Sequence, residues 1–516
     1  MPVNSTHPQY DQFQPAWTRA RAVLAGEDAV KEGGIKYLPM LEAQSEHEYA
    51  AYKARASFFN GTARTAEGYL GLIFRRPPFI KVPEAQADKP PSGLAEAFSN
   101  FSADVDLLGT TLNAYAKNVV SEVIAVGRAG TLLDWSEGSE SRAYCSFYRA
   151  EQILNWQVDR INGRTLLSLI VLFEGSVSGD NSASGYRPSQ MDSGALDPFE
   201  PKCRDQIRVL KLVVTEGTGP NRSSGYLYVV EIWVRTQKQS ADPGDPNKKE
   251  WELLDTRVPM RLGKPLTAIP FIFHGPRHSL PDVEKLPLAD IIAVNLDHYR
   301  LDADYKHGMH YTAMPTAWVS GFEKGSSLKV GASTAWVTET PGAKAEYLEF
   351  TGQGLTTFER AMDRDERLLA ILGSRLLEGQ KKVGEAAQAI ELRQSGENSV
   401  LSSLANSVSQ SLTRLLQWVY WWHSGEEKPD RIDETKVLVE LNTDFSIKGL
   451  DPQEIQAVVA AWQAGAISRE TMTDIFRRGE VLPEGRSVEE EIAAIGPSQS
   501  SAPSPLLLNQ KSRILA

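Results

Sequence analysis

Cysteine is almost absent from this chain. Only Cys145 and Cys203 occur among 516 residues, and neither stands in a metal-binding spacing. A zinc site built from cysteines needs several such ligands close together, so that class of site is excluded. The same scarcity argues against a disulfide-stabilised scaffold and is typical of a protein from a reducing cytoplasm.

Long apolar runs are also missing. No segment approaches the roughly 18 consecutive apolar residues that a membrane-spanning helix requires. The first residues, MPVNSTHPQYDQFQPAW, lack the basic-then-apolar pattern of a secretory signal. We therefore expect a soluble protein of the cytoplasm with no membrane partner.

A basic excess is missing as well. The chain carries 55 Lys and Arg against 66 Asp and Glu, which gives a formal net charge of −11. Proteins that neutralise many phosphates usually carry a basic surplus, so this chain should not clamp duplex DNA over its whole surface. It could line a passage through which DNA slides without sticking, because like charges repel the phosphates.

The motifs of nucleotide-driven motors and of common hydrolases are absent. No G-x-x-x-x-G-K-[ST] phosphate loop, G-x-S-x-G turn or H-E-x-x-H pair occurs, and His47–Glu48 lacks the second histidine. We expect no cofactor, no catalytic residue and no resident metal.

One segment leaves an alternative open. His298 and Asp302 are one helical turn apart and could reach the same metal ion. A metal-dependent DNA-processing enzyme is therefore the alternative hypothesis. The favoured interpretation is a charged, solvated helix face with pairs at i,i+4 spacing. The whole cluster comprises Asp297, His298, Asp302, Asp304, His307 and His310.

Helical and β periodicities occupy different parts of the chain, which indicates the α+β class. The length predicts about two to four domains. Residues 14–31, 42–73 and 104–126 show helical spacing, and Ser102 is a possible N-cap for the last of these helices.

Residues 150–273 alternate with period two, as strands do. Asn162–Gly163 between two of these strands predicts a tight hairpin. Polar insertions at 176–201 and 237–249 are expected to be surface loops.

The segment from Leu286 to His423 has the most informative order of parts. Helices are expected over 287–312 and 355–372, with a small strand-rich insert between them, and the loop 373–384 precedes a long helix over 385–423. In that helix apolar residues step by three and four, like a coiled-coil seam. The seam consists of Leu401, Leu404, Val408, Leu412, Leu415, Val419 and Trp422. No enzyme active site requires this order of parts, whereas a ring of helices around a channel does.

Two charged segments have two interpretations each. The loop 373–384 with Arg375, Lys381 and Lys382 is either an ordinary solvated connection or a mobile basic loop that touches a polyanion. The helix Phe358–Arg367 is either a solvated face or a surface that packs against a copy of itself through paired charges.

The aromatic segment Trp418–Trp422 (WVYWW) closes the long helix. It could be a ligand or membrane patch. The favoured interpretation is a helix end that is buried between neighbouring elements or subunits.

Four N-terminal motifs are specific in wording: Trp17–Arg21 (WTRAR), Gly33–Pro39 (GGIKYLP), Tyr52–Gly61 (YKARASFFNG) and Gly71–Pro78 (GLIFRRPP). They resemble a family of phage and prophage proteins that was long filed as a domain of unknown function and is considered a portal protein family of tailed phages. The resemblance covers roughly residues 17–496.

Portal proteins generally form a twelve-fold ring at one capsid vertex, and the resemblance implies their architecture within an α+β fold. Two features depart from the family pattern: the crown is short, and the insertion at 176–201 has no counterpart. Within the crown, Trp462–Glu470 looks like the turn between two short helices. The implied parts are a wing at 1–285 (helical, then mostly antiparallel β), stem helices at 286–312 and 355–372, a clip at 313–354, a tunnel loop at 373–384, a long helix at 385–423, a return strand at 424–450, a crown at 451–496 and a disordered tail at 497–516.

The resemblance also implies that the protein is assembled in the host cytoplasm and becomes part of the virion. There it would form a channel through which DNA is packaged and ejected. The implied partners are other copies in a twelve-subunit ring, the terminase large subunit, a head–tail adaptor, the major capsid protein, a scaffold protein, and double-stranded DNA bound without sequence specificity. Another ring-forming head–tail connector is a further alternative.

Candidate residues follow from these assignments. The candidate DNA-channel residues are Arg375, Gln380, Lys381 and Lys382. The candidate subunit contacts are Glu359, Arg360, Arg364, Glu366, Arg367, Trp418, Trp421 and Trp422. The candidate clip residues are Trp318, Lys324, Lys329 and Trp336.

Overall fold

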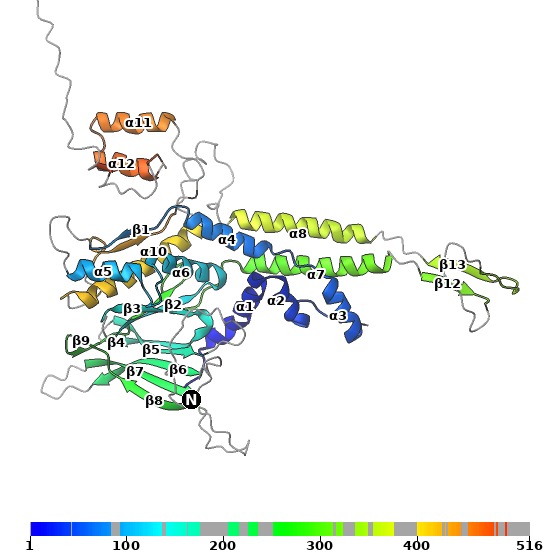
Figure 1. The fold of residues 1–516 in the computed structure, drawn as a ribbon, viewed down its shortest axis with the longest axis horizontal. Helices are drawn as coiled ribbons and strands as arrows, with labels where there is room; N and C mark the ends of the chain where they lie inside the picture. The colour runs from blue at the N-terminus through cyan, green and yellow to red at the C-terminus, as the bar shows by residue number, and fades with distance from the viewer. Residues whose placement is uncertain are drawn as a thin grey trace, which may run out of the picture. The chain divides into compact units, whose positions relative to one another are not determined.

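The structure is a computed structural model that divides into two compact units, Met1–Asp444 and Phe445–Ala516 (Figure 1). Within the described ranges, no helix combines the length and apolarity that a bilayer crossing requires. The described residues are 2–42, 44–83, 93–136, 141–161, 164–175, 205–215, 225–235, 251–312, 316–322, 336–348, 354–375, 400–425, 429, 432–443, 445, 452–478, 481–482 and 491–492.

Helices dominate the first part of unit 1, as the sequence predicts. They are α1 (Pro8–Ala25), α2 (Glu27–Glu32), the 3-10 helix η1 (Gly34–Lys36), α3 (Glu46–Arg55), α4 (Gly61–Ile73), α5 (Gly93–Ala103) and α6 (Leu112–Val126).

The predicted helix boundaries were wrong where local caps intervene. The helix expected over 14–31 is split at Gly26, whose φ of 106° favours glycine. The helix expected over 42–73 is split before Asn60, whose side chain accepts a hydrogen bond from the Ala63 N–H at 3.0 Å and caps α4. Ser102 lies inside α5, and the cap of α6 is Thr111.

Every strand pair in the described residues is antiparallel, and helices and strands occupy separate stretches, in line with the α+β class. A three-stranded sheet has the order β11-β2-β3, and a five-stranded sheet has the order β4-β5-β6-β7-β8. The strands of these sheets are β2 (Ala129–Trp135), β3 (Ala143–Arg149), β4 (Ile153–Ile161), β5 (Arg164–Glu174), β6 (Gln206–Thr215), β7 (Gly225–Arg235), β8 (Trp251–Arg257) and β11 (Phe271–His274).

The tight hairpin predicted between β4 and β5 is confirmed by the pairing of Ile161 with Arg164, because only two residues then connect the strands. Those two residues, Asn162–Gly163, lie outside the described ranges, as do the insertion at 176–201 and the segment 237–249. A second small hairpin joins β9 (Met260–Arg261) to β10 (Lys264–Pro265). The 3-10 helix η2 (Ala150–Gln152) connects β3 to β4.

One face of the five-stranded sheet carries a buried cluster beneath the N-terminal segment. Val3 and Tyr10 pack against Val171, Val209 and Trp251 from three strands. The N–H of His7 donates to the Leu154 carbonyl at 2.9 Å. The first residues of the chain therefore cover this sheet.

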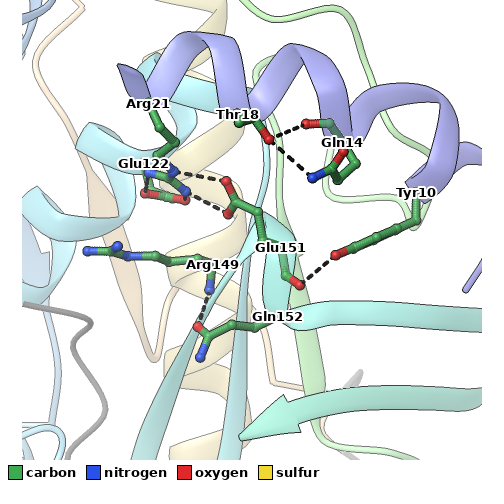
Figure 2. Close-up of polar contacts among 8 residues, drawn as sticks. All are labelled: Tyr10, Gln14, Thr18, Arg21, Glu122, Arg149, Glu151 and Gln152. Atoms are coloured by element: carbon green, nitrogen blue, oxygen red, sulfur yellow. Dashed lines mark hydrogen bonds and ion pairs between the residues drawn. The ribbon is translucent and has the colours of Figure 1, made fainter. Parts of the chain in front are cut away.

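A charged network fixes α1 against α6 and η2 (Figure 2). The guanidinium of Arg21 forms ion pairs with Glu122 on α6 and with Glu151 on η2, the latter at 2.8 Å. Burial alone would lower the pKa of Arg21, but the two carboxylates outweigh it and raise that pKa. The Tyr10 hydroxyl also donates to the Glu151 carbonyl at 3.1 Å. These contacts hold the helical part of the unit on the sheet.

The long helix α10 (Val400–His423) packs against α5, α6, β11 and β14 (Leu438–Glu440). The part of the predicted long helix before Val400 lies outside the described residues. All seven residues of the predicted apolar seam are buried. Ser402, Ser407 and Ser411 on the same helix are buried too, because neighbouring elements cover α10 on several sides.

In the described part of the predicted return segment, 424–450, the strand is the short β14, which pairs with β1 (Phe79–Lys81). Unit 2 contains α11 (Pro452–Gln463) and α12 (Arg469–Arg478), joined by the predicted turn. Gly465 ends α11 in the left-handed conformation with φ 72°, and the Ser468 hydroxyl accepts from the Thr471 N–H at 3.0 Å. The predicted pair of short helices is thus confirmed.

Candidate functional site

Two long helices, α7 (Ala289–Thr312) and α8 (Leu355–Arg375), lie side by side and run antiparallel (Figure 1). The Tyr305 hydroxyl donates to Glu359 at 2.7 Å, and the His298 imidazole lies 3.6 Å from the Glu366 carboxylate. A residue later in α7 therefore lies beside a residue earlier in α8. The end of α7 is therefore beside the start of α8, where the chain between them departs and returns.

The first two-thirds of α7 are attached to α3 and α4. The Asn295 side chain accepts from the Thr62 N–H at 3.0 Å and donates to the Phe59 carbonyl at 2.7 Å. The Asp302 carboxylate accepts from the Ser57 N–H at 2.7 Å. The Tyr52 hydroxyl donates to Asp304 at 2.5 Å, and burial followed by this hydrogen bond raises the pKa of Tyr52. These contacts anchor α7 up to Asp304.

The predicted His/Asp cluster is not a solvated face, because α3 and α8 cover much of it. His298 is buried beside Phe59 and Glu366, whereas Asp302 and Asp304 face α3. Members of the cluster thus contact different elements instead of converging. Among the residues that the structure describes, no group of three or more His, Cys, Asp or Glu side chains could hold a metal ion.

A hairpin of β12 (Thr316–Ser320) and β13 (Lys344–Leu348) interrupts the chain between α7 and α8. Trp318 stands opposite Glu346 and is 42% exposed, and Tyr347 is 53% exposed. Within the described part of the chain, these strands pair only with each other. Among the described strands, none pairs with either outer edge of the hairpin, and unpaired edges are where a further strand can add.

The other clip candidates are described only in part. Trp336 is half-buried. Lys324 and Lys329 lie outside the described residues. The clip assignment of all four residues stays a prediction.

Helix α8 has one buried face and a broad charged surface. Asp365 and Leu369 are buried, at 1% and 6% exposure. The Arg364 guanidinium donates to Asp365 at 3.0 Å while its own side chain stays 64% exposed. The other candidate contacts on this helix, Glu359, Arg360, Glu366 and Arg367, are exposed.

The candidate DNA-channel residues fall mostly beyond the described ranges. Helix α8 continues through Arg375, three residues further than predicted, so Arg375 belongs to its last turn. Gly373 is held there by the Tyr69 hydroxyl, which donates to its carbonyl at 2.5 Å. Gln380, Lys381 and Lys382 lie outside the described residues, and their role stays a prediction.

The tryptophans at the end of α10 are buried by their own chain. Trp418, Trp421 and Trp422 are 7–8% exposed. The Trp422 ring stacks on Trp135 with centroids 5.9 Å apart, and the Arg261 guanidinium lies 4.1 Å from the centre of the Trp421 ring. Neighbouring elements within the chain therefore account for their burial, which was one of the two settings predicted for this helix end.

Hydroxyl groups on α10 bind the backbone of β14 and of the residues that follow it. The Ser409 hydroxyl accepts from the Leu441 N–H at 3.0 Å, and the Thr413 hydroxyl accepts from the Val439 N–H at 3.0 Å. The Ser402 hydroxyl donates to the Thr443 carbonyl at 3.0 Å. The sequence analysis missed this role, although the spacing of seven and four residues between these positions places them on one helix face.

The segment that contains these elements also matches a known family. A family model described as "Domain of unknown function (DUF4055)" matches residues 287–423, roughly a quarter of the chain. The match begins two residues before α7 and ends at the last residue of α10. Among curated proteins, no sequence matches this chain.

Solved structures of gene transfer agent particles have a weak similarity to this chain. A chain of the "Virion of native gene transfer agent (GTA) particle" has 10% identity and a TM-score of 0.37, over 88% of this chain and 99% of that chain. A chain of the "Neck of empty GTA particle computed with C6 symmetry" has 10% identity and a TM-score of 0.36, over 82% and 90%. A chain of the "Neck of native GTA particle computed with C12 symmetry" has 10% identity and a TM-score of 0.34, over 80% and 89%. Similarity this low identifies no function, so the role of the chain is argued from its own geometry.

Proposed function

We propose that this chain is the subunit of a portal ring, a channel at one capsid vertex through which double-stranded DNA is packaged and later ejected. The observation that carries the proposal is the antiparallel pair α7 and α8, which is attached to the body of unit 1 and interrupted by the β12–β13 hairpin. This is the order of stem, clip and stem that the sequence resemblance implies.

The α7–α8 pair is attached to the rest of unit 1 at one end, which suits it to hold the inserted hairpin at the other end. Asn295 joins α7 to α4 and to the segment between α3 and α4, and Asp302 joins α7 to that same segment. Tyr69 on α4 joins the end of α8. The opposite end of the pair leads into the hairpin, and Met309 and Tyr311 are exposed there at 43% and 51%. A helix pair fixed at one end can present the inserted hairpin to a partner.

The partners follow from the proposed role. The terminase would dock on the β12–β13 hairpin during packaging, and a head–tail adaptor would replace it afterwards. Capsid and scaffold proteins would contact the outer surface. DNA would pass along the acidic channel, touched without sequence preference by the loop that contains Lys381 and Lys382. The proposal assigns no catalytic step to this chain.

The metal-dependent enzyme is the less favoured hypothesis, because His298 contacts Glu366 on α8 whereas Asp302 contacts Ser57 in the segment between α3 and α4. Replacing both residues with Ala tests it. Loss of a metal-dependent DNA cleavage activity would support the enzyme, whereas rings that assemble with no such activity to lose would support the portal.

The decisive experiment is electron microscopy of the purified full chain, with its mass measured by light scattering. Rings with a central hole and about twelve subunits are the expected result. A stable dimer that cleaves DNA in the presence of a metal ion would overturn the proposal.

A further inference from the structure

The charges of α8 are sorted by sign along the helix. Successive residues are about 100° apart around a helix, and positions three or four apart share a face. Negative charges recur at that spacing in an acidic stripe, and positive charges recur in a basic stripe shifted by one residue. The acidic stripe is Glu359, Asp363 and Glu366, and the basic stripe is Arg360, Arg364 and Arg367.

Both stripes lie outside the buried face of α8, although two members of the acidic stripe also contact α7. Glu359 accepts from the Tyr305 hydroxyl, and Glu366 lies beside His298. The buried face of α8 contains Asp365 and Leu369, and all six stripe residues are exposed. Glu366 keeps 56% of its side chain exposed although it lies 3.6 Å from the His298 imidazole. The attachment of α8 to α7 therefore leaves most of the charged surface available.

Within a single copy, each stripe places like charges beside one another. Glu359 and Asp363 are like charges at i,i+4, and so are Arg360 and Arg364, a spacing at which like charges destabilise a helix. Asp363 has Arg360 and Arg367 within one turn, yet in the described residues it forms no ion pair with either. A scattered order of the same residues would have avoided both repulsive pairs.

We infer that α8 is a lateral contact between neighbouring copies, in which the acidic stripe of one copy faces the basic stripe of the next. The inference rests on the proposed ring. Copies related by rotation about a ring axis carry parallel α8 helices, and each copy offers a different surface to each neighbour. The one-residue offset between the stripes is a rise of only about 1.5 Å, so opposite charges stand level.

Charge complementarity selects a second copy as the occupant. Duplex DNA would be attracted by the basic stripe but repelled by the acidic stripe beside it. An identical helix offers both signs at the matching spacing. The same contact offsets the repulsion between like charges within each stripe, because each stripe then lies beside opposite charges of the neighbouring copy.

Charge reversal tests this contact in the full-length chain. The first variant, Arg360→Glu with Arg367→Glu, carries acidic residues on both stripes. The second, Glu359→Lys with Asp363→Lys, carries an excess of basic residues on both. Each variant alone should lose its rings in electron microscopy and light scattering. An equal mixture of the two should recover rings that contain both variants, because each then has a complementary neighbour on either side.

A third variant with all four substitutions should also form rings, since both stripes are then exchanged within one chain. A control with reversed charge elsewhere, Arg277→Glu with Lys285→Glu, should keep the rings of the unmodified chain. These two control positions are exposed at 78% and 67% of their side chains. Circular dichroism of each variant verifies that the helices have formed.

The outcomes separate the two proposals. Rings of the unmodified chain that persist in both single-sign variants would overturn the stripe contact and leave the portal ring standing. Loss of rings in the variants without recovery in the mixture or in the fourfold variant would also overturn the contact. An unmodified chain that stays monomeric at every concentration and low ionic strength would overturn the ring and the contact together.

Discussion

The Nδ1 atom of His274 lies 2.7 Å from the hydroxyl of Ser411, and this buried contact joins β11 to the long helix α10. The Nε2 atom of the same ring lies 2.7 Å from the Thr131 hydroxyl on β2. The imidazole thus bridges the three-stranded sheet and α10.

The first prediction concerns the pH dependence of this bridge. Complete burial lowers the pKa of His274 from 6.5 to about 3. Below pH 6.5 the unfolded chain binds a proton that the folded chain excludes, so the stability contributed by the neutral ring is lost as the pH falls from 6.5 towards 3. The loss should be on the order of 1 kcal/mol per pH unit.

Chemical denaturation of the wild type and of His274→Gln at several pH values from 7.5 to 4.5 measures this effect. The variant should be less stable at pH 7.5, and the difference should shrink with acidification, because only the wild type has this titrating group. His7, His307 and His423 have lowered pKa values through burial and add the same trend to both proteins. A difference that is constant with pH would contradict the assignment.

The second prediction concerns the ion pairs of Arg21 with Glu122 and Glu151. Arg21→Met leaves two mostly buried carboxylates unpaired, so the free energy of unfolding should fall by about 3 kcal/mol. The matched control is Lys285→Met, which removes an ion pair with Asp290 whose side chains are 67% and 70% exposed. The control should change stability by about 0–1 kcal/mol. Equal effects in urea denaturation would show that the Arg21 network is as weak as a surface pair.

The third prediction concerns the hydroxyl groups of α10 that bind the backbone of β14 and of the residues after it. Ser409→Ala removes the acceptor of the Leu441 N–H and leaves a buried donor unsatisfied. The expected cost is about 1–3 kcal/mol in the free energy of unfolding. Ser403 is exposed on the same helix, so Ser403→Ala is the control and should leave stability nearly unchanged. A neutral Ser409→Ala would mean that water replaces the hydroxyl.

The fourth prediction concerns the turn between β9 and β10. Leu262 has φ 50° and is 80% exposed, and Gly263 beside it has φ 73°. Two positive φ values in a two-residue hairpin loop are typical of a type I′ turn, where Asn-Gly is preferred. Leu262→Asn should therefore raise the free energy of unfolding by about 0.5–1 kcal/mol. A lower melting temperature for this variant would indicate that the leucine side chain has a stabilising contact.

The fifth prediction concerns the basic loop that the sequence places after α8. Lys381→Glu with Lys382→Glu should leave rings intact but impair DNA packaging or retention, because the phosphates would meet negative charge. Packaged DNA per particle is the measurement. Lys264→Glu with Lys285→Glu, at two exposed positions on the body, is the control. Normal packaging by the loop variant would remove the channel assignment of these lysines.

The sequence by itself determined the kind and order of most elements. Helical spacing predicted α7, α8 and α10, and period-two alternation predicted β4 to β8, because burial of one face imposes these periods on any chain. The tight hairpin between β4 and β5 was also predictable, because Asn-Gly between two alternating segments is a strong sequence signal for a two-residue loop. Boundaries were less predictable, since caps such as Asn60 and Thr111 act over only a few residues.

Tertiary structure alone decided what the polar residues do. Nothing local distinguishes Ser409, which serves a strand, from Ser403, which faces solvent, because the difference lies in the element packed against each side of the helix. The same holds for His298, which the sequence placed on a solvated face and which α8 buries. A charged or hydroxylated side chain acquires its role from partners far away in the chain, and those partners are brought near only when the apolar faces pack together.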